Sequence, residues 1–127
     1  MEKAVIQSPH APAPIGPYNQ AVRYGDLLFV SGQIALHPQS GELVLGSIEE
    51  ETTRVMENLG AILAAGGLTF GHVLKCTVFV TDMNDFSRIN AIYGKYFSEG
   101  SAPARELVQV ASLPRAVHVE ISLVAAG

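Results

Sequence analysis

The chain has 127 residues, of which 48% are hydrophobic and 16% are charged, and its formal net charge is −4 at pH 7. This length predicts a single domain spanning residues 1–127, and the composition is too apolar for a disordered protein. The 8 basic residues are scattered, so we expect no nucleic-acid binding, which needs clustered Lys and Arg. The sequence shows neither a signal peptide nor a membrane span, and it has one cysteine, Cys76, so we expect a cytoplasmic protein.

The first part of the chain predicts an extended segment and two strands. Residues 8–19 hold four of the seven prolines and should therefore be extended, not helical. Residues 20–24 and 27–36 have strand character and are separated by Gly25-Asp26, which is typical of a hairpin turn. Ser31-Gly32 within the second strand indicates a β-bulge.

The middle of the chain predicts a helix, a strand and a second helix. Ser47 can cap the first helix with Glu50 as its capping-box partner, and apolar residues then recur at helical spacing until Gly66-Gly67. Residues 73–81 form a continuous apolar run that predicts a strand buried on both faces. Asp82 or Asn84 can cap the second helix. Its apolar stripe is Phe86, Ile89, Tyr93 and Phe97, and Asn90 borders this stripe.

Residues 106–112 and 116–125 complete the predicted elements as two further strands. The order strand, strand, helix, strand, helix, strand, strand predicts an α+β fold with two helices on one face of a mixed sheet. The four histidines, which are His10, His37, His72 and His118, are dispersed without metal-binding spacing. We therefore expect no metal site.

Two charged residues, Arg105 and Glu120, lie in these strongly apolar final strands. By alternation, Arg105 shares a face with Leu107 and Gln109, and Glu120 lies opposite the apolar face of its strand. If the two strands form a hairpin near Pro114, the two charges are displaced by about 10 Å along the strands. The pattern equally allows a site that another copy of the chain completes.

The pattern also allows structural interpretations of each candidate residue. An arginine at a strand start can form a surface or interchain ion pair, and an alternating glutamate can simply be solvated. Tyr18 and Tyr93 can be packing residues, and Asn90 can be a buried polar residue bonded to backbone. The sequence contains no Walker loop, nucleophile elbow, histidine-based triad or dinucleotide fingerprint.

Five segments, taken in order, resemble the reactive intermediate/imine deaminase A (RidA) family. They are APIGPYNQAV, LLFVSGQIAL, GSIEEETTRVMENLGAILAAGG, KCTVFVTDMNDFSRINAIYGKYF and PARELVQVASLPRAVHVEISLVA, and they run from Ala13 to Ala125. The resemblance implies a chorismate-mutase-like fold and a homotrimer whose ligand clefts lie between subunits.

The implied activity is that of a 2-iminobutanoate/2-iminopropanoate deaminase, which takes part in metabolite damage control. Such an enzyme hydrolyses 2-aminoacrylate-type enamines and imines to 2-keto acids and ammonia without a cofactor. The family's carboxylate-binding arginine falls on Arg105 and its water-associated glutamate on Glu120. The substrate-binding positions fall on Arg105, Tyr18, Ser31, Gly32 and Asn90. A guanidinium can hold a carboxylate through two parallel hydrogen bonds, and a carboxylate can orient water and carry protons.

The chain departs from the family pattern at Glu106-Leu107, where many relatives have Ser-Cys after the arginine. This departure bears on the substrate range, because residue 107 shares a face with Arg105. Two other functions remain open. One is a non-catalytic trimer that senses 2-keto acids or amino acids, and the other is a ribonuclease or translation inhibitor, which the acidic net charge disfavours.

Overall fold

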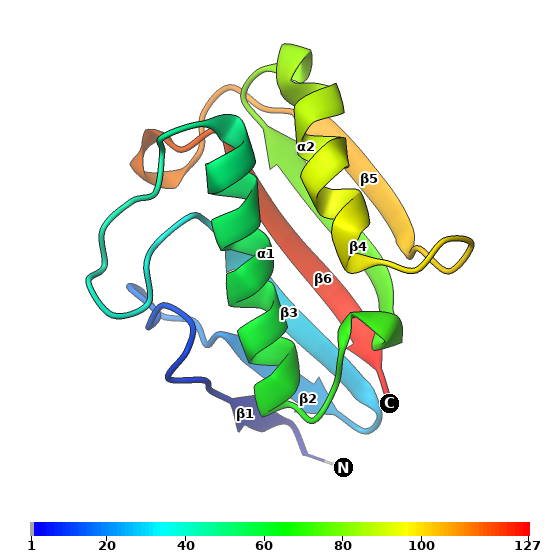
Figure 1. The fold of residues 1–127 in the computed structure, drawn as a ribbon. Coiled ribbons are helices and arrows are strands. Elements are labelled where there is room, and N and C mark those ends of the chain that lie inside the picture. The colour runs from blue at the N-terminus through cyan, green and yellow to red at the C-terminus, as the bar shows by residue number, and fades with distance from the viewer. Residues whose placement is uncertain (1) are drawn as a thin grey trace.

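The computed structural model describes residues 2–127, in which two α-helices lie on one face of a six-stranded sheet (Figure 1). The strands are β1 (Ala4–Ile6), β2 (Ala21–Tyr24), β3 (Leu27–Gln33), β4 (Val73–Val80), β5 (Ala104–Gln109) and β6 (Val119–Ala126), in the sheet order β1-β2-β3-β6-β4-β5. The β4–β5 pair is parallel and all other pairs are antiparallel. The predicted α+β architecture is confirmed, and the three-residue strand β1 was not predicted.

Helix α1 (Ile48–Ala65) begins and ends where the sequence predicts. The Ser47 hydroxyl accepts a hydrogen bond from the Glu50 N–H at 3.1 Å, and the helix ends at Gly66. Its apolar face is fully buried against the sheet; the buried apolar residues include Val55, Met56, Leu59, Ile62 and Leu63. This burial supplies most of the helix's stability, since isolated helices are marginal in water.

Helix α2 (Phe86–Tyr93) is shorter than its predicted apolar stripe. The Asp82 side chain caps a 3-10 turn, Met83–Asp85, which leads directly into the helix. Phe97 lies beyond the helix end, where its ring packs against Tyr93 with 4.9 Å between ring centroids. Phe86 is 37% exposed at the start of α2, so this end of the stripe is not core.

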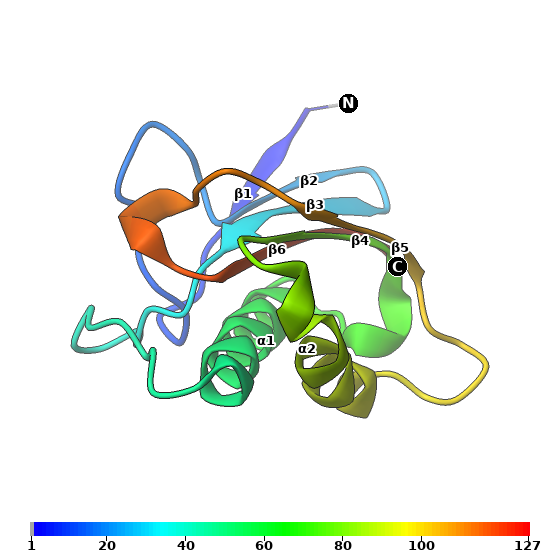
Figure 2. The same cartoon turned by 90° about the horizontal axis from the view of Figure 1, so that it is seen from above.

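The sheet has one covered face and one open face, and Figure 2 shows both helices on the same side. The prediction that β4 is buried on both faces is therefore wrong for the single chain, because Phe79 is only half-buried. Phe29 and Val108, which are 46% and 45% exposed, lie on the same open face as Phe79. A continuous apolar run thus does not distinguish a doubly covered strand from one with an exposed apolar face.

The last two strands do not form the hairpin that was considered from the sequence. β4 lies between them, paired with β5 on one side and β6 on the other. A hairpin of β5 with β6 would leave one edge of β4 unpaired, whereas in the observed order both edges of β4 are paired. The connection instead passes through a 3-10 turn, Pro114–Ala116, before β6.

Candidate functional site

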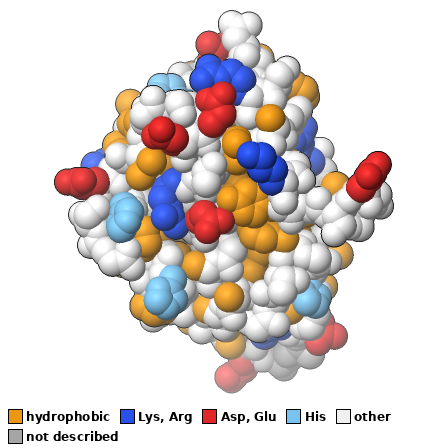
Figure 3. All heavy atoms as spheres, viewed as in Figure 1, with side chains coloured by type: hydrophobic (Ala, Val, Ile, Leu, Met, Phe, Trp, Pro, Cys, Tyr) orange, Lys and Arg blue, Asp and Glu red, His pale blue; other side chains and the backbone are white. Residues whose placement is uncertain are grey.

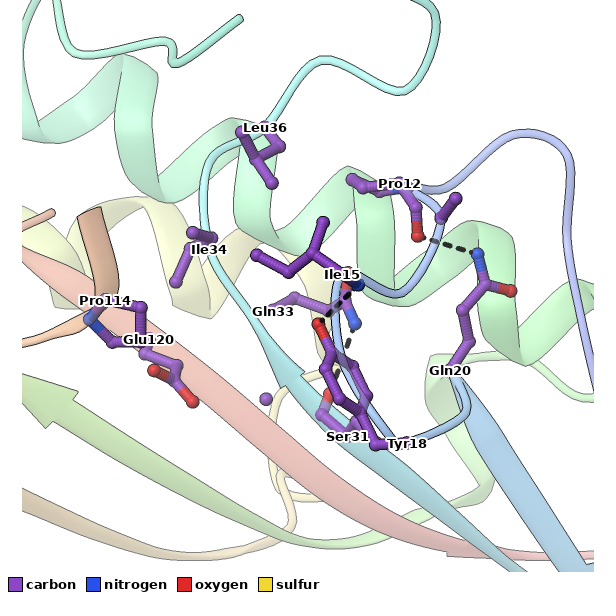
Figure 4. A pocket seen from close by; sticks show the side chains of 12 residues that line it. Pro12, Ile15, Tyr18, Gln20, Ser31, Gln33, Ile34, Leu36, Pro114 and Glu120 are labelled. Atoms are coloured by element: carbon purple, nitrogen blue, oxygen red, sulfur yellow. Dashed lines mark hydrogen bonds between the residues drawn. The ribbon is translucent and has the colours of Figure 1, made fainter. Parts of the chain in front are cut away.

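A cavity of about 380 Å³ opens beside the bulge of β3 (Figure 4). Four of the six predicted site residues line it: Tyr18, Ser31, Gly32 and Glu120. The other lining residues are mostly apolar: Pro12, Ala13, Ile15, Gln20, Gln33, Ile34, Leu36 and Pro114. The cavity therefore combines one carboxyl group and a few other polar groups with a largely apolar wall, which is typical of a small-molecule site.

The β3 bulge places Gly32 directly against Glu120. The pairing of β3 with β6 shifts register between Val30 and Gln33, which confirms the predicted bulge at Ser31-Gly32. A Cβ atom at position 32 would overlap the Glu120 carboxylate, so only glycine leaves room for that side chain. Partial burial raises the pKa of the Glu120 carboxyl above its ordinary value, because burial disfavours the charged form. Glu120 is thus a carboxylate suited to exchanging protons.

The loop before β2 forms one wall of the cavity, and the buried Gln20 side chain holds it in place. Its Nε2 donates to the carbonyls of Ser8, Ala11 and Pro12 at 3.1, 3.3 and 2.9 Å, and its Oε1 accepts from the Ser8 N–H at 2.6 Å. Because its prolines keep this segment out of a helix, the segment has no helical backbone hydrogen bonds. The hydrogen bonds of the Gln20 side chain hold its backbone instead. Gln20 was not among the predicted site residues.

Two further hydrogen bonds hold this loop. One, from Ser31, joins the loop to β3, and the other, to Tyr18, lies within the loop. The Ser31 hydroxyl donates to the Asn19 carbonyl at 2.6 Å, and the Tyr18 hydroxyl accepts from the Ile15 N–H at 3.4 Å. Figure 4 shows Tyr18 and Ile15 on the side of the cavity opposite Pro114 and Glu120. The two sides therefore come from chain segments about 100 positions apart.

Two buried polar residues of α1, Asn58 and Glu51, hold the remaining walls. Asn58 donates to the Ile34 and Leu36 carbonyls at 3.2 and 3.0 Å. Glu51 accepts from the backbone N–H groups of His118 and Val119 at 2.7 and 3.0 Å, and lies 2.8 Å from the His118 Nδ1 atom. Both were missed, although they lie on the apolar face of the predicted helix, seven residues apart.

Arg105 occupies a separate position, under α2 on the covered face of the sheet. Its Nη1 donates to the Asn90 Oδ1 atom at 2.6 Å, and its Cζ lies 4.9 Å from the Tyr93 ring centroid and 5.8 Å from that of Phe86. The Nε and Nη2 groups have no hydrogen-bond partner among residues 2–127. A half-buried guanidinium with free N–H groups is suited to binding an anion.

The structure does not bring Arg105 and Glu120 together within one chain. Arg105 pairs with Cys76 of β4, and Glu120 pairs with Phe79 of the same strand. Three positions along β4 offset them by about 10 Å in the strand direction, and β5 and β6 are about 10 Å apart across the sheet, on either side of β4. The odd offset also places the two side chains on opposite faces. One chain therefore divides the predicted site residues into two groups, one around Glu120 and one around Arg105 and Asn90.

The residues that depart from the RidA pattern have structural partners. Leu107 packs against the core on the face that Arg105 shares, as alternation predicts. Glu106 lies on the open face and forms a 3.0 Å ion pair with Lys75. Cys76 is fully buried, and burial raises the pKa of its thiol, which makes it unreactive.

The charged side chains and possible metal ligands were compared with the requirements of other kinds of site. Figure 3 shows acidic and basic side chains interspersed on the helix-bearing face, without a basic stripe there. Among residues 2–127, no group of three or more His, Cys, Asp or Glu side chains could hold a metal ion. No helix in that range is long and apolar enough to cross a membrane.

Comparison with known proteins identifies the family of this chain. Residues 8–127 match the sequence profile of the family described as endoribonuclease L-PSP. This chain belongs to that family, which includes the Rid proteins. The resemblance to the RidA proteins is thereby confirmed.

Individual relatives cover nearly the whole chain. The 2-iminobutanoate/2-iminopropanoate deaminase of Mus musculus is 50% identical over 123 residues, which are 97% of this chain and 90% of the relative. The RutC family protein slr0709 of Synechocystis is 51% identical over 126 residues, covering 98% and 97% of the two chains. The crystal structure of E. coli TdcF with bound serine has a TM-score of 0.92 and 43% identity, and covers 98% of each chain.

Proposed function

We propose that this protein is a cofactor-independent deaminase that hydrolyses 2-imino acids to 2-keto acids and ammonia. The observation that carries the proposal is the pair of complementary partial sites: a guanidinium with free N–H groups and a half-buried carboxylate beside a cavity. The name of the mouse relative, and the same name given to relatives from Rattus norvegicus and Bos taurus, supports the assignment.

The active site in this proposal lies between neighbouring protomers of a homotrimer. Arg105 and Asn90 of one protomer meet Glu120, Tyr18, Ser31 and Gly32 of the next. The open face of the sheet supports an assembly, because it exposes large apolar side chains such as Phe29 and Val108. Both residue groups are incomplete alone, and a closed ring would complete each of them with an identical partner.

In the proposed reaction, Arg105 holds the substrate carboxylate through two hydrogen bonds and so fixes the imine carbon. Glu120 orients a water molecule and accepts one of its protons as the oxygen bonds to that carbon. Glu120 then returns this proton to the carbinolamine nitrogen. The C–N bond breaks as the oxygen forms the C=O bond of the 2-keto acid, and the hydroxyl proton passes back to the Glu120 carboxylate as ammonia leaves. A protonated imine is already electrophilic, so the hydrolysis needs no oxidant and no organic cofactor.

The test generates imino acids in solution with an amino acid oxidase and traps them with semicarbazide. Active protein should reduce the trapped product, because hydrolysis competes with trapping, and it should release ammonia. Several amino acids that differ in side-chain size would be compared, since the cavity wall is apolar. A folded, trimeric sample that reduces trapping with none of these substrates would contradict the proposal.

A second candidate function is a trimer that binds an amino acid or keto acid without turnover. The solved relative with bound serine favours this alternative. It needs the Arg105 guanidinium but gives no role to the Glu120 carboxylate. Binding of a 2-keto acid without ammonia release from any imine would support it over the deaminase.

A further inference from the structure

One face of α2 surrounds the Arg105 guanidinium. Phe86, Asn90 and Tyr93 are spaced by four and three residues, so they line the same side of the helix. Asn90 bonds the guanidinium at Nη1, and the two aromatic rings lie 5.8 and 4.9 Å from its Cζ atom. The arginine is thus held by one hydrogen bond and two ring faces.

Tyr93 is the buried member of this group. Its side chain is 6% exposed and packs against the Phe97 ring. Its hydroxyl is buried next to the Cys76 thiol and has no oxygen or nitrogen hydrogen-bond partner among residues 2–127. Burial also raises the pKa of Tyr93, so the ring stays a neutral phenol and offers the guanidinium no negative charge. The attraction between Tyr93 and Arg105 therefore comes from the face of the ring.

We propose that Tyr93, assisted by Phe86, is a positioning residue that fixes the plane of the Arg105 guanidinium for its ligand. The proposal rests on the proposed function in one respect, namely that Arg105 binds the substrate carboxylate. The Asn90 bond alone leaves the guanidinium free to rotate about its contact, whereas the two rings close to its Cζ atom restrict that rotation. The Nε and Nη2 hydrogens then keep one orientation toward an incoming carboxylate.

In this proposal, Arg105 and the Tyr93 ring act together in binding a carboxylate. Bidentate recognition of a carboxylate needs a planar fork, and its strength depends on holding that fork in one orientation before binding. An arginine without such contacts would be mobile before binding, and ordering its side chain would cost conformational entropy each time the ligand binds. Loss of the ring should consequently weaken substrate binding more than it slows the chemical step.

The first test compares Tyr93→Leu with Tyr96→Leu. Tyr96 is a matched control, because it is also an aromatic residue near the end of α2 but packs on Phe70 and donates to Glu57, away from Arg105. Tyr93→Leu should raise KM for the imine, and Kd for a 2-keto acid, by about 3- to 30-fold, with a smaller change in kcat. Tyr96→Leu should lower stability and leave KM unchanged.

Two further variants test the same role if Tyr93→Leu does not fold. Tyr93→Phe retains the ring and should bring KM back to within about threefold of wild type. Phe86→Leu removes the exposed outer ring and should raise KM in a folded trimer. Unchanged KM in both Tyr93→Leu and Phe86→Leu would overturn the proposal, and so would an equal loss in Tyr93→Phe and Tyr93→Leu.

A ligand-free measurement separates this proposal from the proposed function. The NMR signal of the Arg105 Nε–H group should be shifted by the Tyr93 ring current in wild type and in Tyr96→Leu, and should lose that shift in Tyr93→Leu. If wild type shows this ring-current shift but binds no 2-keto acid, the result would contradict the proposed function and still support the positioning role. An Arg105 signal that is the same in wild type and Tyr93→Leu would overturn the positioning role whatever the activity.

Discussion

Gly32 determines where the Glu120 carboxylate can lie. A methyl group at position 32 would occupy the place of that carboxylate, and β3 cannot move away because it is paired with β6. Gly32→Ala should therefore displace Glu120 and lower kcat/KM for the imine by about 10-fold or more. The measurement is the trapping assay on a variant shown to be folded by circular dichroism.

Gly94→Ala is the matched control for that substitution. Gly94 follows α2 with a helical backbone, and a Cβ atom there would meet nothing within 4 Å. The control should retain wild-type kinetics. Equal activity of Gly32→Ala and wild type would show that the position of Glu120 does not matter for turnover.

Glu120 also predicts the pH dependence of the reaction. Its pKa is raised above the ordinary 4.5 by burial, and the reaction needs the ionised carboxylate to accept a proton from water. Activity should therefore fall as the pH drops through a value above 4.5. A pH profile of kcat/KM should show this acidic limb in wild type and lose it in Glu120→Gln. An acidic limb that persists in the variant would assign the titration to another group.

The raised pKa has the opposite consequence for stability. The folded protein favours the neutral carboxyl, so the contribution of Glu120 to stability is present below the ordinary pKa. That contribution is lost as the pH rises through the folded-state value. Ionised Glu120 thus costs some stability at the pH where it is active.

At the scale of elements, α1 both covers the sheet and holds the backbone of the cavity walls. Glu51 is buried and accepts two backbone hydrogen bonds from the residues directly before Glu120. Glu51→Ala would leave those N–H groups unpaired and should lower the free energy of unfolding by about 2–4 kcal/mol. Urea denaturation would measure this, with the exposed Glu50→Ala expected to cost less than about 1 kcal/mol. Similar losses in the two variants would contradict the role given to Glu51.

Local patterns predicted the elements that their own residues specify. The Ser47 cap, the α1 stripe and the Ser31-Gly32 bulge depend on neighbours in sequence, and all three are confirmed. The position of β6 between β3 and β4 depends on pairing across the sheet, which alternation does not encode. Gln20, Asn58 and Glu51 were missed for a related reason, because a buried polar side chain differs from a solvated one only in its distant partners.

The candidate site shows the same division between local and distant information. Alternation placed Arg105 on the face of Leu107, and the structure agrees. The contact of Arg105 with Asn90 joins β5 to α2 and is not readable from either segment. The grouping of Tyr18 with Glu120 likewise requires the fold, since a loop and a distant strand form the two sides of one cavity.

At the scale of the whole molecule, the central claim is that one protomer supplies Arg105 and its neighbour supplies Glu120. The two residues project from opposite faces of the sheet, so a single chain cannot place both against one small substrate. Arg105→Ala and Glu120→Gln should each lower kcat/KM by about 10- to 100-fold as homotrimers. Trimers that mix the two variants therefore distinguish a shared site from one formed within a chain.

The decisive measurement is the deaminase activity of such mixed trimers, made by co-expressing the two variants with different affinity tags and purifying through both. In a closed ring of three, either mixture contains one interface with an intact Arg105 facing an intact Glu120. Such mixed trimers should therefore show about one third of wild-type activity. Trimers that combine Arg105→Ala with the double variant have no intact interface and should stay as inactive as the parents. Mixed trimers of the two single variants that are no more active than their parents would contradict the shared site.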